Sequence, residues 1–275
     1  MKKILILLFL ILPLTLHAQE AENPTSGTCG ENCSWKIEGN TLVLNGYGDI
    51  ASQTPTKQPW YWNERNITKI EIQNQEGTPG FTSIGEHVFE YMSHASEVSL
   101  PETMQRIEAE AFNGSGLTKV NIPNSVKEIG FTAFNDNNLT ELKIPDSLTN
   151  INVHAFSANP IKVLIIPEGI TEIHPYAFYC RGCSSTLDGR AMPLEEIYCS
   201  TSQIAQCQAA VSHFGDNVKI HEYQKFGNSY YVDGKFYNHA NDIWDNNYIK
   251  KRIYTVEEAV LVSKPNGNTF RLRYR

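Results

Sequence analysis

Apolar residues recur through the middle of the chain with a period of 22 or 23 residues. Three columns share the period: Leu100-Pro101, Ile122-Pro123, Ile144-Pro145 and Ile166-Pro167; Ile84, Ile107, Ile129, Ile151 and Ile173; Phe89, Phe112, Phe134, Phe156 and Phe178. Three columns with one period indicate a single structural unit that is repeated. Stacked repeats present a long surface, so the pattern favours a binding surface over a chemical pocket.

Each repeat contains the pattern of one short strand. Polar and apolar residues alternate in segments 97–101, 119–123 and 141–145, which is the period expected of a half-buried strand. Proline ends each strand because it has no N–H group for the sheet. Alanine precedes the column phenylalanine in all copies but the first. A polar turn such as 135–138 then follows this Ala-Phe pair, and its residues tolerate left-handed backbone.

A single repeat buries too few apolar side chains to offset the conformational entropy of ordering its backbone. Stacked repeats can bury phenylalanine against phenylalanine and isoleucine against isoleucine, with rungs about 4.8 Å apart. We therefore predict a mainly β repeat solenoid, leucine-rich-repeat-like, with rungs of 22–23 residues. An N-terminal β-hairpin cap and a small C-terminal α+β tail complete the predicted fold.

The repeat pattern resembles the BspA-type leucine-rich repeats of bacterial secreted and surface proteins. Residues 117–134, LTKVNIPNSVKEIGFTAF, are the clearest copy, and proline replaces the usual Asn/Cys column after the strand. Segments 26–35 and 39–48 are similar to the region that often precedes such repeats. The resemblance covers about residues 26–220 and implies adhesion to host matrix or to neighbouring bacteria.

Four regions are expected along the chain. Residues 1–18 read as a signal peptide, with Lys2 and Lys3 before an apolar run and Ala18 at the cleavage point. Residues 19–59 form the β cap, with a hairpin that pairs 35–37 with 42–44. Residues 60–222 form the repeat solenoid, which ends in a strand at 194–199, a helix at 203–214 and a strand at 218–220. Residues 223–275 form the tail.

The tail differs from the repeats in its pattern. Residues 230–237 read as a hairpin that turns at Asp233-Gly234. The sequence Thr-Val-Glu-Glu at 255–258 is a capping box and predicts a helix to about residue 263. Residues 270–275 alternate apolar residues with arginine, which predicts a strand with one basic edge, either a docking signal or a solvated edge.

The charge excludes one class of partner. The chain has 23 basic and 30 acidic residues, and loss of Lys2 and Lys3 with the signal peptide leaves 21 against 30, a net charge of −9. This charge opposes binding to nucleic acid. No further apolar run approaches 20 residues, so we expect no transmembrane segment in the mature chain.

All six cysteines follow the signal peptide, and an even number in an exported chain favours disulfides. Chain order suggests the pairs Cys29–Cys33, Cys180–Cys183 and Cys199–Cys207. The Cys-x-x-Cys motif at 180–183 has two alternative interpretations. It could be a redox pair, although the thioredoxin-like context for one is absent. It could also be half of a zinc site that Cys199 and Cys207 complete.

The sequence contains no catalytic motif: a Gly-x-Ser-x-Gly elbow, a His-Glu-x-x-His pair and a phosphate loop are all absent. His87 and His154 share one repeat position but lie three rungs apart, about 15 Å, which is too far to share a metal ion. We therefore predict exposed turn histidines, no metal site, no cofactor and no enzymatic activity.

The outward-facing strand positions are the candidate binding surface. One column reads Glu97, Lys119, Glu141, Val163, Glu196, and its neighbour reads Ser99, Asn121, Lys143, Ile165, Tyr198. The predicted contact residues are Val163, Ile165, Tyr198, Lys143, Asn121 and Glu141, because an apolar patch with an aromatic anchor and a polar surround is typical of protein interfaces. The alternative is that the insertion at 180–193 folds over the apolar members.

Three functions compete. The first is an exported binding protein, extracellular or at the cell surface or else periplasmic, that holds a protein partner of host matrix or cell surface. The second is an enzyme or carbohydrate-binding unit in residues 223–275, a segment short for a pocket. The third is a structural spacer in the cell envelope.

Overall fold

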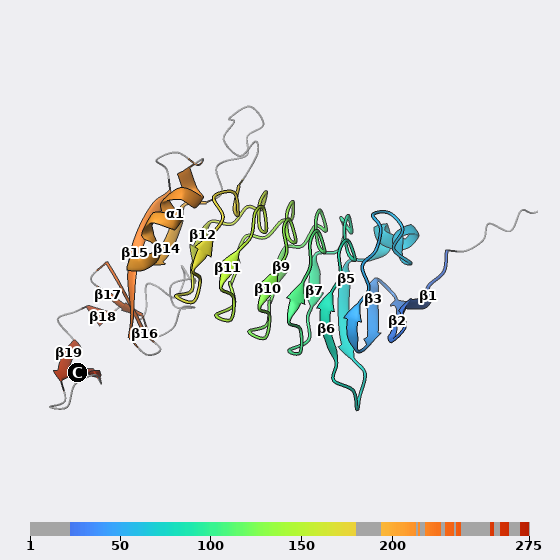
Figure 1. Ribbon diagram of the computed structural model, residues 1–275, viewed down its shortest axis with the longest axis horizontal. Helices are drawn as coiled ribbons and strands as arrows, with labels where there is room; N and C mark the ends of the chain where they lie inside the picture. Colours follow the sequence, from blue (N-terminus) through green and yellow to red (C-terminus); the bar gives the residue numbers. More distant parts are fainter. Residues whose placement is uncertain are drawn as a thin grey trace, which may run out of the picture.

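The computed structural model describes residues 23–179, 194–212, 214, 218–226, 229–233, 235–237, 254–255, 259–263 and 270–274. Successive repeats lie side by side along the long axis, from a β-rich N-terminal end to α1 and the last strands (Figure 1). The predicted signal peptide and the segment 180–193 lie outside the described residues. Within the described part of the chain, no helix has the length and apolar character needed to cross a membrane.

The described part of the first half of the chain contains ten strands and one 3₁₀ helix, all short. These elements are β1 Ser26–Gly30, β2 Cys33–Glu38, β3 Thr41–Gly46, β4 Gly48–Ile50, η1 Tyr61–Asn66, β5 Lys69–Asn74, β6 Phe81–Ile84, β7 Glu97–Ser99, β8 Arg106–Ile107, β9 Lys119–Val120 and β10 Glu128–Ile129.

The second half adds the single α-helix of the described residues. Its elements are β11 Asn150–Ile151, β12 Val163–Ile165, β13 Glu172–Ile173, β14 Glu196–Ser200, η2 Thr201–Gln203, α1 Ile204–Val211, β15 Lys219–Phe226, β16 Ser229–Val232, β17 Lys235–Tyr237, β18 Tyr254–Thr255, β19 Ala259–Ser263 and β20 Phe270–Tyr274.

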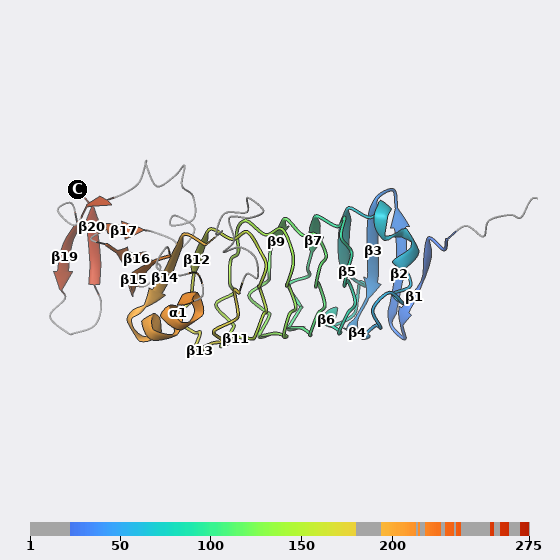
Figure 2. The same cartoon turned by 90° about the horizontal axis from the view of Figure 1, so that it is seen from above.

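Most repeats contribute a strand to each of two rows. Figure 2 shows β3, β5, β7, β9 and β12 along one side of the stack, and β4, β6, β11 and β13 along the other. Pairing from repeat to repeat is parallel, and equivalent residues lie opposite one another: Glu97 faces Lys119, and Ile107 faces Ile129. The sequence period therefore becomes a spatial column, so a residue type repeated every 22 or 23 positions forms a continuous stripe.

The strands of the first row are short because proline closes them. β7 and β9 end before Pro101 and Pro123, whose nitrogens cannot donate to a ladder. The strand predicted at 141–144 is not formed, although Leu142 and Ile144 remain buried in the core. Inward packing of apolar side chains therefore persists where the backbone ladder is interrupted.

A stack of phenylalanine rings forms the centre of the core. Phe89, Phe112, Phe134 and Phe156 lie nearly parallel to their neighbours, with centroids 5.1 to 5.5 Å apart. Phe178 continues the stack at 6.1 Å. Offset parallel rings at this spacing add dispersion and quadrupole attraction to the apolar area they bury.

The N-terminal hairpin closes this core. Trp60 is fully buried, stacks on Phe89 at 5.6 Å and meets Trp35 of β2 edge to face at 5.9 Å. β2 and β3 pair antiparallel around Gly39 in the predicted register, which sets Trp35 opposite Leu44. β3 then pairs parallel with β5.

Two buried asparagines, which the sequence pattern did not single out, tie neighbouring turns together. Asn137 accepts a bond from the Leu117 N–H at 2.9 Å and donates to the Phe112 carbonyl at 2.8 Å. Asn159 makes the same pair of bonds one repeat later, to Leu139 and Phe134. The asparagine column thus lies in the turn before each strand position and bonds to the turn of the preceding repeat.

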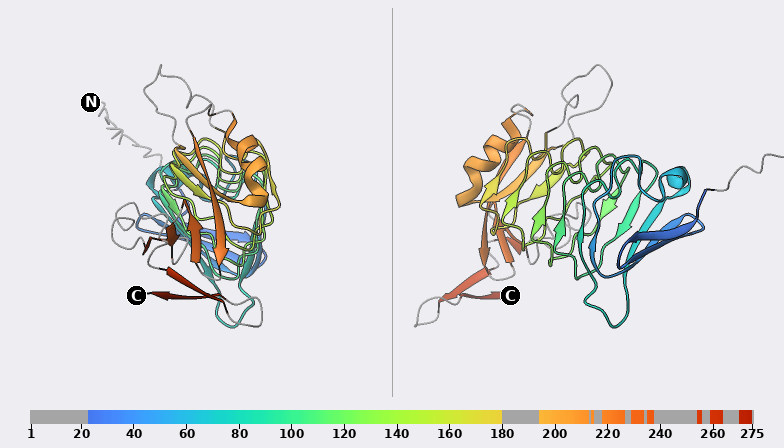
Figure 3. Two further views of the ribbon diagram at one scale, coloured as in Figure 1. Left: turned by 90° about the vertical axis from the view of Figure 1, so that its left-hand side faces the viewer. Right: turned by 45° about the vertical axis from the view of Figure 1, so that its right-hand side comes forward.

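The C-terminal end of the stack is closed by η2 and α1, which lie beside β14 and β15 (Figure 3). Ser200 and Gln203 form a capping box, and the Gln203 amide donates to the Pro167 and Ile170 carbonyls. The predicted disulfides Cys29–Cys33 and Cys199–Cys207 are both formed. The second disulfide excludes these thiols from the zinc site considered above, while Cys180 and Cys183 lie outside the described residues.

The tail departs from prediction in one element. The hairpin is present as β16 and β17, with the positive-φ residue Asp233 at its turn, and β20 is the predicted last strand. The helix predicted at 255–263 is wrong, because 259–263 form β19, paired antiparallel with β20. Its segment Ala-Val-Leu-Val-Ser is rich in β-branched residues, and strand pairing outweighs the local capping signal.

Candidate functional site

The polar part of the outward columns is exposed in the structure. Residues from three consecutive repeats face solvent in this part: Glu97, Ser99, Lys119, Asn121, Glu141 and Lys143. Lys69 of β5 extends the first column, so that positive and negative side chains alternate from rung to rung. Hydrogen bonding to Glu71 raises the pKa of Lys69, and the charges of Glu71 and Glu97 raise it further.

A shallow open depression of about 170 Å³ lies within this polar surface, between β7 and β9. Its lining combines opposite charges with small polar groups, because it is formed by Glu97, Ser99, Lys119 and Asn121 over the buried Val98. Such a surface suits the polar side chains of another macromolecule better than an apolar small molecule, which needs an enclosed pocket.

The apolar members of the predicted contact patch are not exposed. Ile165 and Tyr198 are only 5% and 9% exposed, in a cluster with Tyr223 and Val232, against which Val163 also packs. The expectation that Ile165 and Tyr198 are exposed is therefore wrong. The reason is that β15 continues beyond its expected end and the β16–β17 hairpin pairs onto it, which places two apolar side chains over the patch.

The strand β15 and its hairpin cover the apolar residues. The alternative considered from the sequence, that the insertion 180–193 folds over them, concerns a segment outside the described residues. The hydroxyl of Tyr223 donates to the Ile166 carbonyl at 2.6 Å, which ties the covering strand β15 to the rung that carries Ile165.

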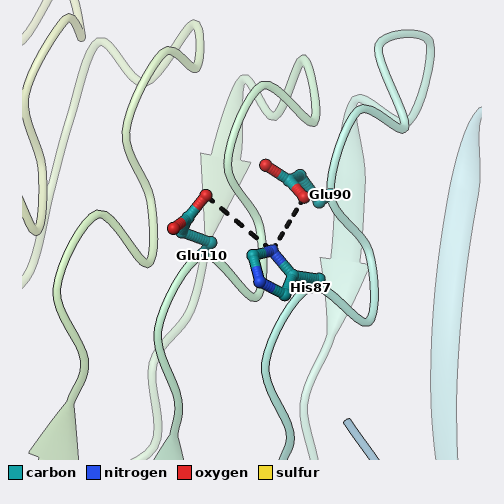
Figure 4. Close-up of side chains that lie close together, drawn as sticks. All are labelled: His87, Glu90 and Glu110. Atoms are coloured by element: carbon teal, nitrogen blue, oxygen red, sulfur yellow. Dashed lines mark hydrogen bonds and ion pairs between the residues drawn. The ribbon is translucent and has the colours of Figure 1, made fainter. Parts of the chain in front are cut away.

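A second group of polar side chains lies in the turns that carry the phenylalanine column. His87 Nδ1 lies 2.8 Å from Oε2 of Glu90 and 3.8 Å from Oε2 of Glu110 (Figure 4). One donor atom from each of the three residues lies within 4.8 Å of the other two. The Glu90 side chain is 1% exposed, whereas those of His87 and Glu110 are 24% and 27% exposed, so the cluster is open to solvent on one side.

Repeat geometry brings the three residues together. His87 and Glu110 hold the same position in adjacent rungs, and each has a left-handed backbone, with φ of 60° and 56°. Backbone bonds from Phe89 N to Ala111 O and from His87 N to Ala109 O join the two turns. Side chains that are 23 positions apart in the chain therefore emerge from neighbouring loops in one orientation.

Electrostatics within the cluster reflect two adjacent carboxyl groups. Burial raises the pKa of the Glu110 carboxyl, and hydrogen bonding and charge repulsion from Glu90 raise it further. The charge of Glu90 also raises the pKa of the neighbouring Tyr91 hydroxyl. Among the described residues, neither carboxylate forms an ion pair with lysine or arginine.

The histidines differ from the predicted exposed turn residues. His87, His154 and His174 are half-buried, and each makes a hydrogen bond at its ring. Histidines three rungs apart are too distant to share a metal ion, but His87 lies beside carboxylates of its own and the next rung. The signal that could have found it is the shared repeat position of residues 87 and 110, with a glutamate three residues after the first.

Comparison with known proteins identifies the repeats. The model of the "BspA type Leucine rich repeat region" matches residues 57–186 in six copies. The sequence matches none of the curated proteins.

One solved structure shares the fold, and two others are more distantly similar. A leucine-rich repeat protein from Eubacterium ventriosum is 20% identical with a TM-score of 0.54; the match covers 76% of this chain and 48% of that protein, so the chain spans about half its length. A leucine-rich repeat protein from Bacteroides ovatus is 15% identical, with coverages of 70% and 66% and a TM-score of 0.28. A leucine-rich cell surface protein from Faecalibacterium prausnitzii is 14% identical, with coverages of 72% and 95% and a TM-score of 0.23.

Proposed function

Since residues 57–186 of this chain are a BspA-type leucine-rich repeat region, we propose that the protein is exported and binds a protein partner through the polar face of its first strand row. This role is non-enzymatic, and the partner is a matrix or surface protein of a host or a neighbouring cell. The predicted signal peptide at residues 1–18 supports export to the cell surface or the medium.

The observation that carries this proposal is the exposure of six polar side chains from three consecutive rungs on one face. Glu97, Lys119 and Glu141 alternate in charge along that face, and the depression between β7 and β9 lies among them. A partner with the opposite alternation would pair with each charge in turn. Such complementarity contributes mainly to specificity and association rate.

The test is charge reversal on this face. Lys119→Glu and Lys143→Glu should each weaken binding to immobilised matrix proteins and to intact neighbouring cells, and binding of the unmodified protein should fall with added salt. The matched control is Lys127→Glu, which makes the same change at an exposed lysine beside β10, in the other strand row. Folded Lys119→Glu and Lys143→Glu variants that bind as well as the control would contradict the proposal.

Export is tested separately by cell fractionation and by digestion of intact cells with an added protease. The protein should leave the cytoplasm and should be cut on intact cells. Retention in the cytoplasm would contradict export, whatever the outcome of the binding experiment.

A further inference from the structure

We propose that His87, Glu90 and Glu110 form a binding site for a single divalent transition-metal ion, with Zn²⁺ the best match to the donor atoms. The site lies on the turns between the strand rows, away from the polar face proposed to bind protein, and it is independent of that proposal.

The distances match a zinc ion after small side-chain adjustments. Bonds of about 2.0–2.1 Å at tetrahedral angles place ligand atoms about 3.3 Å apart. The separations of His87 Nδ1 from the Glu90 and Glu110 oxygens, 2.8 and 3.8 Å, lie on either side of this value. Three protein ligands leave a fourth position, and the partly exposed side of the cluster gives water access to it.

The chemistry of the donors selects the class of ion. Imidazole nitrogen suits zinc and other first-row transition metals, whereas calcium takes six to eight oxygen ligands and magnesium an octahedron of oxygens that usually includes several waters. A neutral imidazole and two carboxylates carry a charge of −2, which a divalent ion neutralises. Neutralisation by the metal ion matters most at Glu90, because the desolvation of a carboxylate that is 1% exposed costs much free energy unless an opposite charge lies beside it.

Neighbouring amides hold Glu90 in the orientation that metal binding needs. Asn113 Nδ2 donates to Glu90 Oε1 at 2.9 Å, and Asn135 Nδ2 donates to Asn113 Oδ1 at 2.9 Å one rung further along. This chain fixes one carboxylate oxygen and leaves Oε2 facing His87. Outer partners of this kind orient metal ligands and are a regular part of metal sites.

Gln58 provides an independent observation at the same loop. Its side-chain amide donates to the backbone carbonyls of His87 and Glu90, at 2.8 and 3.3 Å. The residue is 4% exposed, and its Oε1 has no hydrogen-bond partner among the described residues. A buried polar side chain therefore braces the loop that carries two of the three ligands, with one oxygen still unsatisfied.

The chain contains its own control for this site. His154 occupies the same repeat position as His87, with φ of 55°, but the residue three positions later is Ser157, whose hydroxyl lies 2.9 Å from His154 Nδ1. The next rung supplies Tyr176 where Glu110 follows His87. This second histidine shares the backbone geometry and lacks both carboxylates.

The test is calorimetric titration of ZnCl₂ into the full chain after removal of metal with EDTA and dialysis. We expect one zinc per chain, and binding weakened by at least about 10–100-fold in His87→Gln and Glu110→Gln, since loss of an outer partner alone has that effect. Asn113→Ala should weaken binding as well, whereas His154→Gln should bind as the wild type does. Circular dichroism confirms that each variant is folded.

The zinc ligands can also be identified in the wild-type protein, without any variant. X-ray absorption at the zinc edge should show one imidazole and otherwise oxygen ligands. No zinc binding, a sulfur ligand, or unchanged affinity in folded His87→Gln or Glu110→Gln would overturn the proposal. Calcium binding as tight as zinc binding would overturn the assignment of the metal class.

Discussion

The phenol ring of Tyr198 lies flat on the imidazole of His221, with centroids 4.5 Å apart and planes 13° apart. The two residues face each other across the β14–β15 pairing. His221 Nδ1 lies 2.6 Å from Asp233 Oδ2 at the turn of the β16–β17 hairpin, and the Tyr198 hydroxyl donates to Glu196 at 2.8 Å. The aromatic ring expected to anchor a partner instead connects the repeat stack to the C-terminal hairpin.

Removing the Tyr223 side chain should release this hairpin from the repeats. Tyr223→Ala deletes a ring that is 1% exposed, and truncation of a buried aromatic typically costs about 3–5 kcal/mol. Tyr223→Phe keeps the ring and removes the hydroxyl that bonds to the Ile166 carbonyl, which should cost about 1 kcal/mol. Both values can be measured by denaturant unfolding.

Limited proteolysis gives a second measurement of hairpin release. Tyr223→Ala should speed cleavage near residues 229–237, and Gln224→Ala, at an exposed position of the same strand, should leave the rate unchanged. Equal cleavage rates for both variants would show that Tyr223 does not hold the hairpin in place.

The phenylalanine stack should dominate the stability of the repeats. Phe134 contacts Phe112 and Phe156 at ring centroid distances of 5.2 and 5.5 Å and is completely buried, so Phe134→Ala should lower the free energy of unfolding by about 3–5 kcal/mol. Phe131, three residues earlier and 45% exposed, is the matched control, and its replacement by alanine should cost well under half as much. Similar losses in the two variants would argue against a continuous aromatic core.

The repeat period predicted those parts of the fold that depend on local sequence. The columns at Phe134 and Ile144 identified the core because every rung places the same position inward, with or without a regular strand. The hairpin around Gly39 and the disulfide Cys199–Cys207 also followed from neighbouring residues. Local spacing determines these features, so no knowledge of distant contacts was needed.

The candidate sites depended on contacts that the period does not encode. Ile165 and Tyr198 read as an exposed patch because nothing in their own rungs shows that Tyr223 covers them, 25 positions beyond Tyr198. His87 and Glu110 share one repeat position but are different residue types, so a comparison of histidines alone does not bring them together. Contacts between distant segments, and columns that contain different residue types, are therefore what the repeat period does not predict.

Protonation of His154 should make the repeats less stable in acid. Burial lowers the pKa of the His154 imidazole below its ordinary value of 6.5, and the charge of His174 lowers it further. The unfolded chain takes up this proton first, so the stabilising contribution is complete above about pH 6.5 and is lost as pH falls through the lower folded value. Thermal unfolding across this range should show a shallower pH dependence for His154→Gln than for the wild type. Parallel profiles would contradict the assignment.

Asn137 should contribute more to stability than its size suggests, because its amide satisfies two buried backbone groups of the preceding turn. Its side chain accepts from the Leu117 N–H and donates to the Phe112 carbonyl, and the residue is 4% exposed. Asn137→Ala leaves both groups without a partner, and each buried unsatisfied group costs about 1–3 kcal/mol, so we expect a total loss of roughly 2–6 kcal/mol. Asn138→Ala is the control, since this adjacent asparagine is exposed and its single bond, to the Gly116 carbonyl, is 3.4 Å long. Denaturant unfolding measures the stability of both variants. Equal free energies of unfolding would show that water replaces the amide in the turn. A large loss confined to Asn137→Ala would show that the asparagine column stabilises the repeat about as much as the phenylalanines do.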